Sequence, residues 1–171
     1  MKRPEANEYS PYFKKYIDLV KHDNVLKALK DQVMDIQALV SGIPEDKEEY
    51  AYAEGKWTIK EVLGHIIDTE RIMSYRALRF ARKDKTELNS FDENLFVANA
   101  KFNKQSLYNL AHEFAIVREA NLALWKQFEE EEMSQSGIAN KNEMSVRAIL
   151  FMIAGHTTHH MNVIKLNYLL D

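Results

Sequence analysis

Apolar residues recur at every third or fourth position of the segment 107–128, and this spacing constrains the fold more than any other feature of the chain. An α-helix completes one turn in about 3.6 residues, so side chains spaced in this way share one face. Such a face must be buried against a partner, and the segment therefore predicts an amphipathic helix of a helical protein. Its series, in which only Asn121 is polar, is Leu107, Leu110, Phe114, Val117, Asn121, Leu124 and Phe128.

Three further segments have helical periodicity. The first runs from about residue 23 to Gly42, where the glycine favours a helix end. The second begins after Thr58, with Glu61 at the spacing of a capping box, and continues to about residue 82. The last starts near residue 144 or 145 and continues to about residue 169.

Residues that interrupt helices are scarce, with 5 Gly and 3 Pro among 171 residues. No alternation of apolar and polar residues is long enough to indicate a β-strand. We therefore predict an all-α fold, a four-helix bundle formed by residues 1–171 as a single domain. Residues 83–103 form a long connection between the second and third helices. Connections of this length in compact domains are typically functional or cross the bundle.

The composition excludes several kinds of site and partner. The chain has no Cys, so disulfides, thiolate ligands and a Cys nucleophile are excluded, and a metal has to be held by His, carboxylate or water. A net charge of −3 and a pI near 6.1 argue against a nucleic-acid partner. Without an apolar run approaching the length of a membrane span or a signal peptide, we expect no membrane partner and a cytoplasmic location.

Three of the six histidines lie within the segment 156–160. On a helical wheel His156 falls at the centre of the apolar face, and His160 lies about 40° away from it. Because residues four apart lie one above the other on a helix, these two side chains can bind one ion. His159 falls about 60° to the other side, near the edge of the face. Two other interpretations fit the spacing: buried histidines hydrogen-bonded to oxygen atoms, or a pair formed by His156 and His159.

A third histidine ligand has to come from another helix. His22 precedes the first helix and His112 lies on the polar face of the third, which leaves His65 on the second. His65 lies at the border of that helix, about 100° from the centre of its apolar arc. This position is typical both of a ligand at the rim of a cleft and of an exposed histidine. The chain has no Glu-x-x-His or His-Glu-x-x-His motif, which argues against a ferritin-type di-iron centre and a zincin-type protease.

Two motifs in combination resemble a known family. Residues 55–71 read Gly-Lys-Trp-Thr-Ile-Lys-Glu-Val-Leu-Gly-His-Ile-Ile-Asp-Thr-Glu-Arg, and residues 154–160 read Ala-Gly-His-Thr-Thr-His-His. This combination resembles the DinB-like family of small four-helix-bundle metalloenzymes over nearly the whole chain. The resemblance implies a divalent metal held by His65, His156 and His160, with His159 as an adjacent non-ligand histidine. It also implies similarity to hydrolases and to transferases that use bacillithiol, mycothiol or glutathione.

Three neutral imidazoles on Zn²⁺, Ni²⁺ or Fe²⁺ leave a position for water or substrate, as in catalytic sites. We therefore expect a metal-dependent enzyme for a small-molecule substrate, in which the metal activates water or a low-molecular-weight thiol co-substrate. Asp68, one turn from His65, is either a base, a group that orients a ligand, or a solvated helix acid. His159 is a further candidate for orienting a ligand. Arg76 lies about 20° from the direction of His65 and is either an anchor for an anionic substrate or a helix-end cation.

Two other functions fit the same residues. A non-haem iron enzyme would use two histidines with Asp68 or another carboxylate. A non-enzymatic interaction module, stabilised by the metal and forming a homodimer, would need the histidines only for structure.

Overall fold

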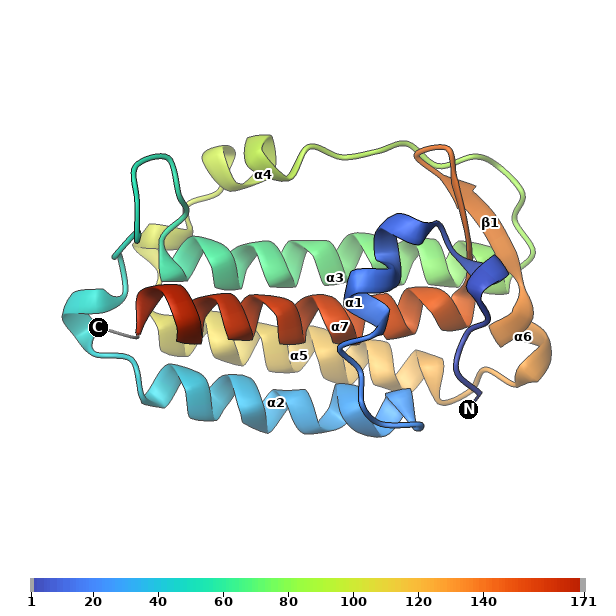
Figure 1. The fold of residues 1–171 in the computed structure, drawn as a ribbon, viewed down its shortest axis with the longest axis horizontal. Helices are drawn as coiled ribbons and strands as arrows, with labels where there is room; N and C mark the ends of the chain where they lie inside the picture. The colour runs from blue at the N-terminus through green and yellow to red at the C-terminus, as the bar shows by residue number, and fades with distance from the viewer. Residues whose placement is uncertain (1, 170–171) are drawn as a thin grey trace.

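Four long helices lie side by side along the molecule (Figure 1). The computed structural model describes residues 2–169. Helix α2 spans Val25–Ser41, α3 spans Ile59–Ala81, α5 spans Leu107–Trp125, and α7 spans Val146–Val163. A π-helical turn, Ile164–Tyr168, extends α7. The four-helix bundle predicted from the sequence is therefore confirmed.

The helix boundaries follow from local chemistry. The backbone N–H groups of a first helical turn lack partners within the helix, and small polar side chains supply them. The side chain of Asn24 accepts from the backbone of Lys27 at the start of α2. Thr58 and Glu61 form the predicted capping box at the start of α3. Ser106 and Ser145 cap α5 and α7 in the same manner.

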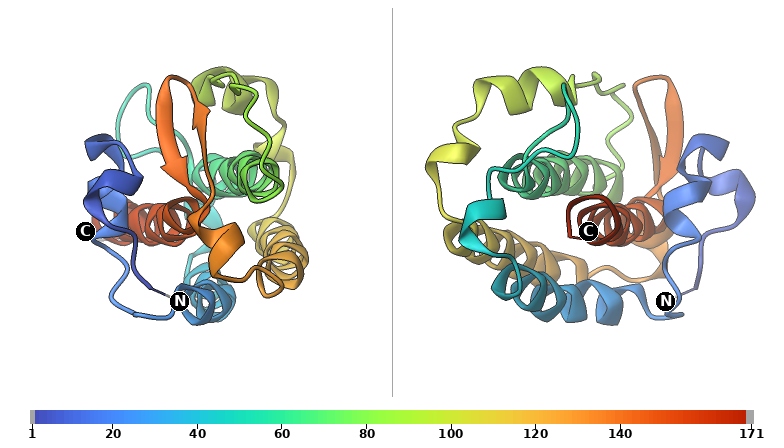
Figure 2. Two further views of the ribbon diagram at one scale, coloured as in Figure 1. Left: turned by 90° about the vertical axis from the view of Figure 1, so that its right-hand side faces the viewer. Right: turned by 60° about the vertical axis from the view of Figure 1, so that its left-hand side comes forward.

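The order of the helices around the bundle differs from a simple up-and-down arrangement. Helix α2 packs against α5 and α7, and α3 packs against the same two helices. The consecutive helices α2 and α3 therefore occupy diagonal corners, with α5 and α7 between them (Figure 2). One consequence is that the second and the last helix are neighbours, although 64 residues lie between Ala81 and Val146.

A short β-hairpin adds to the all-α architecture. Strand β1 (Ser136–Ala139) pairs antiparallel with β2 (Asn142–Ser145). Asn140 and Lys141 connect them with φ angles of 50° and 62°, the left-handed conformation typical of a two-residue hairpin turn. The sequence did not predict this element because four residues are too few for an alternating pattern to be recognised.

The remaining short helices cover the bundle. Helix α1 (Lys14–Ile17) packs against α7, and α6 (Glu130–Ser134) precedes the hairpin. The long connection after α3 contains α4 (Glu93–Asn99), which packs on α3. Among residues 2–169, none of the helices combines the length and the apolar character needed to cross a bilayer. Single 3₁₀ turns lie at Ala6–Glu8, Pro11–Phe13, Glu45–Lys47 and Phe102–Lys104.

Two apolar clusters form the core, and a buried polar network joins the four long helices. Arg118 on α5 donates to both carboxylate oxygens of Glu70 on α3, each at 2.8 Å. The same guanidinium donates to the carbonyl of Leu29 at 2.6 Å and to Gln32 on α2 at 3.0 Å. Asn121, the polar exception in the apolar series of α5, donates to Glu70 at 3.1 Å. Its polarity is explained by this network.

Candidate metal centre

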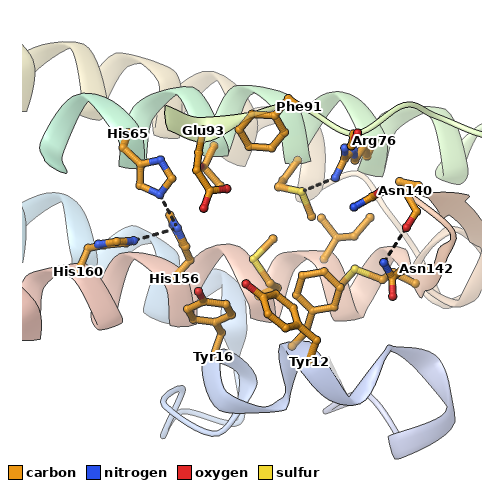
Figure 3. Close-up of a pocket in the computed structure, with 18 of the residues that line it drawn as sticks. Tyr12, Tyr16, His65, Arg76, Phe91, Glu93, Asn140, Asn142, His156 and His160 are labelled. Atoms are coloured by element: carbon orange, nitrogen blue, oxygen red, sulfur yellow. Dashed lines mark hydrogen bonds between the residues drawn. The ribbon is translucent and has the colours of Figure 1, made fainter. Parts of the chain in front are cut away.

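Three histidine side chains from α3 and α7 meet inside the bundle (Figure 3). The Nε2 atom of His156 lies 3.1 Å from the Nε2 of His65 and 3.1 Å from the Nε2 of His160. Ligand atoms of these three residues all lie within 4.8 Å of one another. The structure thus brings together the three histidines proposed as ligands, and the packing of α3 against α7 is what does so.

His65 is more deeply buried than its position on the helical wheel indicated. The wheel placed it at the border of an apolar stripe, whereas the structure leaves only 6% of it exposed. Helix α3 is covered on several sides, because it packs against α5, α7 and α4. A wheel with a single buried face therefore underestimates the burial of a residue on this helix. The ring of Trp57 also covers the imidazole of His65, with ring centroids 4.7 Å apart.

The nitrogen geometry fits a shared ion better than hydrogen bonds among the histidines. In the plane of the imidazole, Nε2 carries either one proton or one lone pair. The Nε2 of His156 can therefore form a well-directed hydrogen bond with only one of its two neighbours, and the other 3.1 Å contact is left without one. Two nitrogens bound at about 2.0–2.1 Å to one tetrahedral ion lie about 3.3 Å apart, close to the separations seen here. A divalent ion would satisfy all three lone pairs at once.

Burial keeps these imidazoles in the form that binds metals. It lowers the pKa of His65 to about 4 and that of His160 to about 3. Burial, reinforced by the neighbouring His160 and His65, lowers the pKa of His156 well below its usual value. All three rings are consequently neutral near neutral pH, with a lone pair free for a metal.

The histidines lie at one end of a cavity of about 530 Å³. Helices α3 and α7 form one wall, and the other walls come from parts of the chain far away in sequence. The N-terminal segment supplies aromatic side chains, α4 and the residues before it supply Ser90, Phe91 and Glu93, and the hairpin supplies two asparagines (Figure 3). The lining residues at or near the histidine end include Tyr16, Trp57, Thr69 and Glu93.

A comparison with protein families decides the classification. Residues 28–164 match the family model of the DinB superfamily. The chain belongs to the DinB superfamily. This finding bears out the resemblance seen in the two sequence motifs.

This DinB-superfamily chain is similar to one curated protein in sequence and to two solved structures in fold. A protein of Oceanobacillus iheyensis, OB0413, whose name describes it provisionally as a metal-dependent hydrolase, is 27% identical over 148 residues, covering 82% of each chain. YfiT from Bacillus subtilis, described as a probable metal-dependent hydrolase with an unusual four-helix bundle topology, superimposes with a TM-score of 0.74 at 15% identity and covers 96% of this chain and 90% of YfiT. The mycothiol-dependent maleylpyruvate isomerase superimposes with a TM-score of 0.66 at 12% identity. That match covers 87% of this chain but only 62% of the isomerase.

Of the other residues proposed for the site, one lines the cavity and two do not. Arg76 lines the cavity, at the end away from the histidines (Figure 3). Asp68 does not line it; its carboxylate lies 3.5 Å from Arg71, and burial raises its pKa. The ring of His159 contacts Tyr16, with centroids 5.4 Å apart, and lies outside the cavity lining. An iron site built from two of these histidines would therefore need another carboxylate in place of Asp68.

A different carboxylate, which no sequence motif identified, lies near the histidines. Glu93, the first residue of α4, points into the cavity near His65 and His156 (Figure 3). It lies in the long connection, outside any motif, so no spacing rule could have identified it. Tyr16 was likewise not selected, although its ring centroid is 5.5 Å from that of His156. Both depend on packing between distant segments.

Proposed function

We propose that this chain is a metal-dependent enzyme that holds one divalent ion with His65, His156 and His160. The observation that carries the proposal is the convergence of three neutral Nε2 atoms, since hydrogen bonds among the rings cannot satisfy all of them. Nitrogen ligands of this kind suit Zn²⁺, Ni²⁺ and Fe²⁺. The three histidines lie at one end of a cavity large enough for a small-molecule substrate, as expected of a catalytic rather than a structural site.

A divalent ion held by His65, His156 and His160 would supply a Lewis acid that polarises a substrate carbonyl and lowers the pKa of a nucleophile. The surrounding side chains exclude water, accept a proton and donate a hydrogen bond. Trp57 lies against His65 and keeps water from that side of the ring. Glu93 is placed to accept a proton within the cavity. Burial raises the pKa of Tyr16 to about 12, so its hydroxyl stays protonated and acts as a hydrogen-bond donor.

Two reactions use this machinery, and they differ in the nucleophile. Hydrolysis uses water, in line with what the names of OB0413 and YfiT describe. Transfer to a low-molecular-weight thiol uses the thiol as co-substrate, and the fold shared with a mycothiol-dependent isomerase favours this second candidate. Hydrolysis is the first choice because OB0413, which matches 82% of this chain in sequence, carries that description.

The ligand assignment is tested by metal content. The purified protein, and its His65→Ala and His156→Ala variants, are stripped with a chelator, refilled with Zn²⁺ or Ni²⁺, and analysed for bound metal. His112→Ala is the matched control, because His112 is an exposed histidine on α5. We expect about one ion per chain in the parent and the control, and a loss of affinity of 10-fold or more, about 1.4 kcal/mol, in each ligand variant. Undiminished affinity in both ligand variants would refute the site.

The nucleophile is tested by turnover of the zinc-loaded and nickel-loaded proteins. Aryl esters and amides are supplied with and without a thiol such as bacillithiol or glutathione. Product formation in the absence of thiol supports hydrolysis, and thiol consumption matched to product supports transfer. Activity that persists in the chelated protein would contradict both.

A further inference from the structure

Helix α3 presents an ordered series of side chains to the cavity. His65, Thr69, Met73 and Arg76 all line it, at successive spacings of four, four and three residues. Residues at these spacings follow one face of a helix. His65 and Arg76 therefore mark two ends of one strip, separated by about 16 Å along the helix axis.

Arg76 is a buried cation that has no anionic partner within the described part of the chain. Only 8% of the residue is exposed. Its Nη2 donates to the backbone carbonyl of Asn89 at 2.8 Å, its Nη1 lies 3.3 Å from the sulfur of Met73, and the ring of Phe91 lies 5.9 Å from its Cζ. No carboxylate within residues 2–169 pairs with it, and burial lowers its pKa. A buried charge costs free energy unless it is paired. An anion bound to this guanidinium would offset that cost.

Other arginines of this molecule have carboxylate partners within the chain. Arg118, fully buried in the core, is paired with Glu70. Arg147, also buried, is paired with Glu8 and Glu130. Arg79, one turn beyond Arg76 on the same helix, is paired with Asp84. Buried arginines elsewhere in this molecule are thus neutralised within the chain, whereas the one that lines the cavity is not.

Thr69 adds a second unmet polar group on the same strip. The residue is 6% exposed, and its hydroxyl has no hydrogen-bond partner within the described part of the chain. A buried hydroxyl without a partner costs free energy. Rotation about the Cα–Cβ bond of Thr69 would turn the hydroxyl toward the cavity, where a ligand atom would recover this free energy. Because Thr69 follows His65 by one turn, that ligand atom lies close to the histidines.

The surface between these polar groups is apolar. Met73 of α3 and Met152 and Ile149 of α7 line the cavity along its length. Flexible thioether side chains adapt to chains of different shape. At the end of the cavity near Arg76, the side-chain amides of Asn140 and Asn142 come from the hairpin (Figure 3).

We infer, on the basis of the metal site proposed above, that the substrate is an elongated organic carboxylate. Its reacting group lies at the histidines within reach of the Thr69 hydroxyl, its apolar chain crosses Met73 and Met152, and its carboxylate binds Arg76. A carboxylate fits better than a phosphate dianion, because a single guanidinium balances one negative charge. A planar carboxylate also matches the fork of the guanidinium.

Two matched probes separate the ends of the cavity. Octanohydroxamate offers a metal-binding group on an apolar chain, and the monohydroxamate of suberic acid adds a carboxylate at the far end of a chain with the same number of carbons. Their affinities for the zinc-loaded protein are measured by calorimetry, together with those for Arg76→Gln and for the control Arg79→Gln. We expect the added carboxylate to tighten binding by about 10- to 100-fold in the parent and the control, and not in Arg76→Gln.

The outcomes distinguish this inference from the proposed function. If octanohydroxamate binds equally well with and without metal, the metal site is wrong. If octanohydroxamate needs the metal but the carboxylate adds no affinity, or adds as much in Arg76→Gln as in the parent, the carboxylate subsite is wrong. Tighter binding of octyl phosphate than of octanoate to the metal-free protein would also overturn the choice of carboxylate.

A stability measurement shows whether the Arg76 variant is still folded. Arg76→Met removes a buried cation that has no counter-ion, so its melting temperature should equal or exceed that of the parent, while binding of octanoate to the metal-free protein is lost. Thr69→Val keeps the volume of the side chain but removes the hydroxyl. It should weaken octanohydroxamate by about 3- to 10-fold without affecting the gain from the carboxylate. A melting temperature of Arg76→Met well below that of the parent would show that the guanidinium stabilises the fold instead of binding a ligand.

Discussion

Gly155 of α7 lies directly against the backbone of Tyr16, so closely that a Cβ atom at position 155 would come within 1.9 Å of the Tyr16 carbonyl oxygen. Helix α1 can approach α7 this closely only because Gly155 has no side chain. The contact matters for the site because Tyr16 lines the cavity beside His156, the neighbour of Gly155 in sequence.

Gly155→Ala should therefore displace α1 and loosen this wall of the cavity. We expect a loss of about 1–3 kcal/mol of unfolding free energy from the forced shift of the backbone. Urea denaturation measures it, with Gly42→Ala as control, since a Cβ at Gly42 meets no atom closer than 3.6 Å. Equal stability of the two variants would contradict the close packing of α1 on α7.

The buried pair of Glu70 and Arg118 yields a prediction about coupling. Removing one partner leaves an uncompensated charge among the four helices, so Glu70→Leu and Arg118→Met should each cost about 3–5 kcal/mol. The double variant should be markedly more stable than the sum of the two single losses implies, because no charge is then left unpaired. Urea denaturation of all four proteins gives the coupling energy. Additive losses would mean that the pair is not an energetic unit.

The stability of the metal-free protein should fall as the pH is lowered. Burial holds the pKa of His65 at about 4 and that of His160 at about 3, whereas an unfolded histidine titrates near 6.5. Between these values the unfolded chain binds more protons than the folded one, so unfolding is favoured as the pH falls below about 6.5 and down through about 4. The loss should be on the order of a few kcal/mol and should show as a falling melting temperature.

A variant separates this effect from general acid denaturation. His65→Gln removes one of the groups that resist protonation, so its melting temperature should decline less steeply between pH 6.5 and 4 than that of the metal-free parent. His112→Gln, which alters an exposed histidine, should follow the parent. Identical slopes for all three proteins would contradict the buried neutral state of His65.

Metal binding should be visible in tryptophan fluorescence. Trp57 lies against His65 with ring centroids 4.7 Å apart. Trp125, at the C-terminal end of α5, is instead buried in an apolar cluster of the core. Titration of the metal-free protein with Ni²⁺, a quenching ion, should reduce the emission with saturation near one equivalent. The response should disappear in Trp57→Phe and persist in Trp125→Phe. Quenching that follows Trp125 would place the ion elsewhere.

Local regularities in the sequence determined the helices and part of the site. The spacing of apolar residues, the caps at Thr58 and the scarcity of Gly and Pro were sufficient to predict four long helices. The four-residue spacing of His156 and His160 placed both rings on one buried face. These features depend on bonds and contacts within one or two helical turns, and such local terms can be read directly from the order of residues.

Only the tertiary structure decided which residues of other segments meet these histidines. Around the axis of α3, Asp68 lies about 60° to one side of His65 and Thr69 about 40° to the other, and a helical wheel cannot tell which of them faces α7. The diagonal placement of α2 and α3 turns Thr69 toward the cavity and leaves Asp68 beside Arg71. Glu93 and the asparagines of the hairpin join the cavity through long-range packing, which no local pattern encodes. The unpaired state of Arg76 is decided in the same way, because it depends on which carboxylates the fold keeps away from it.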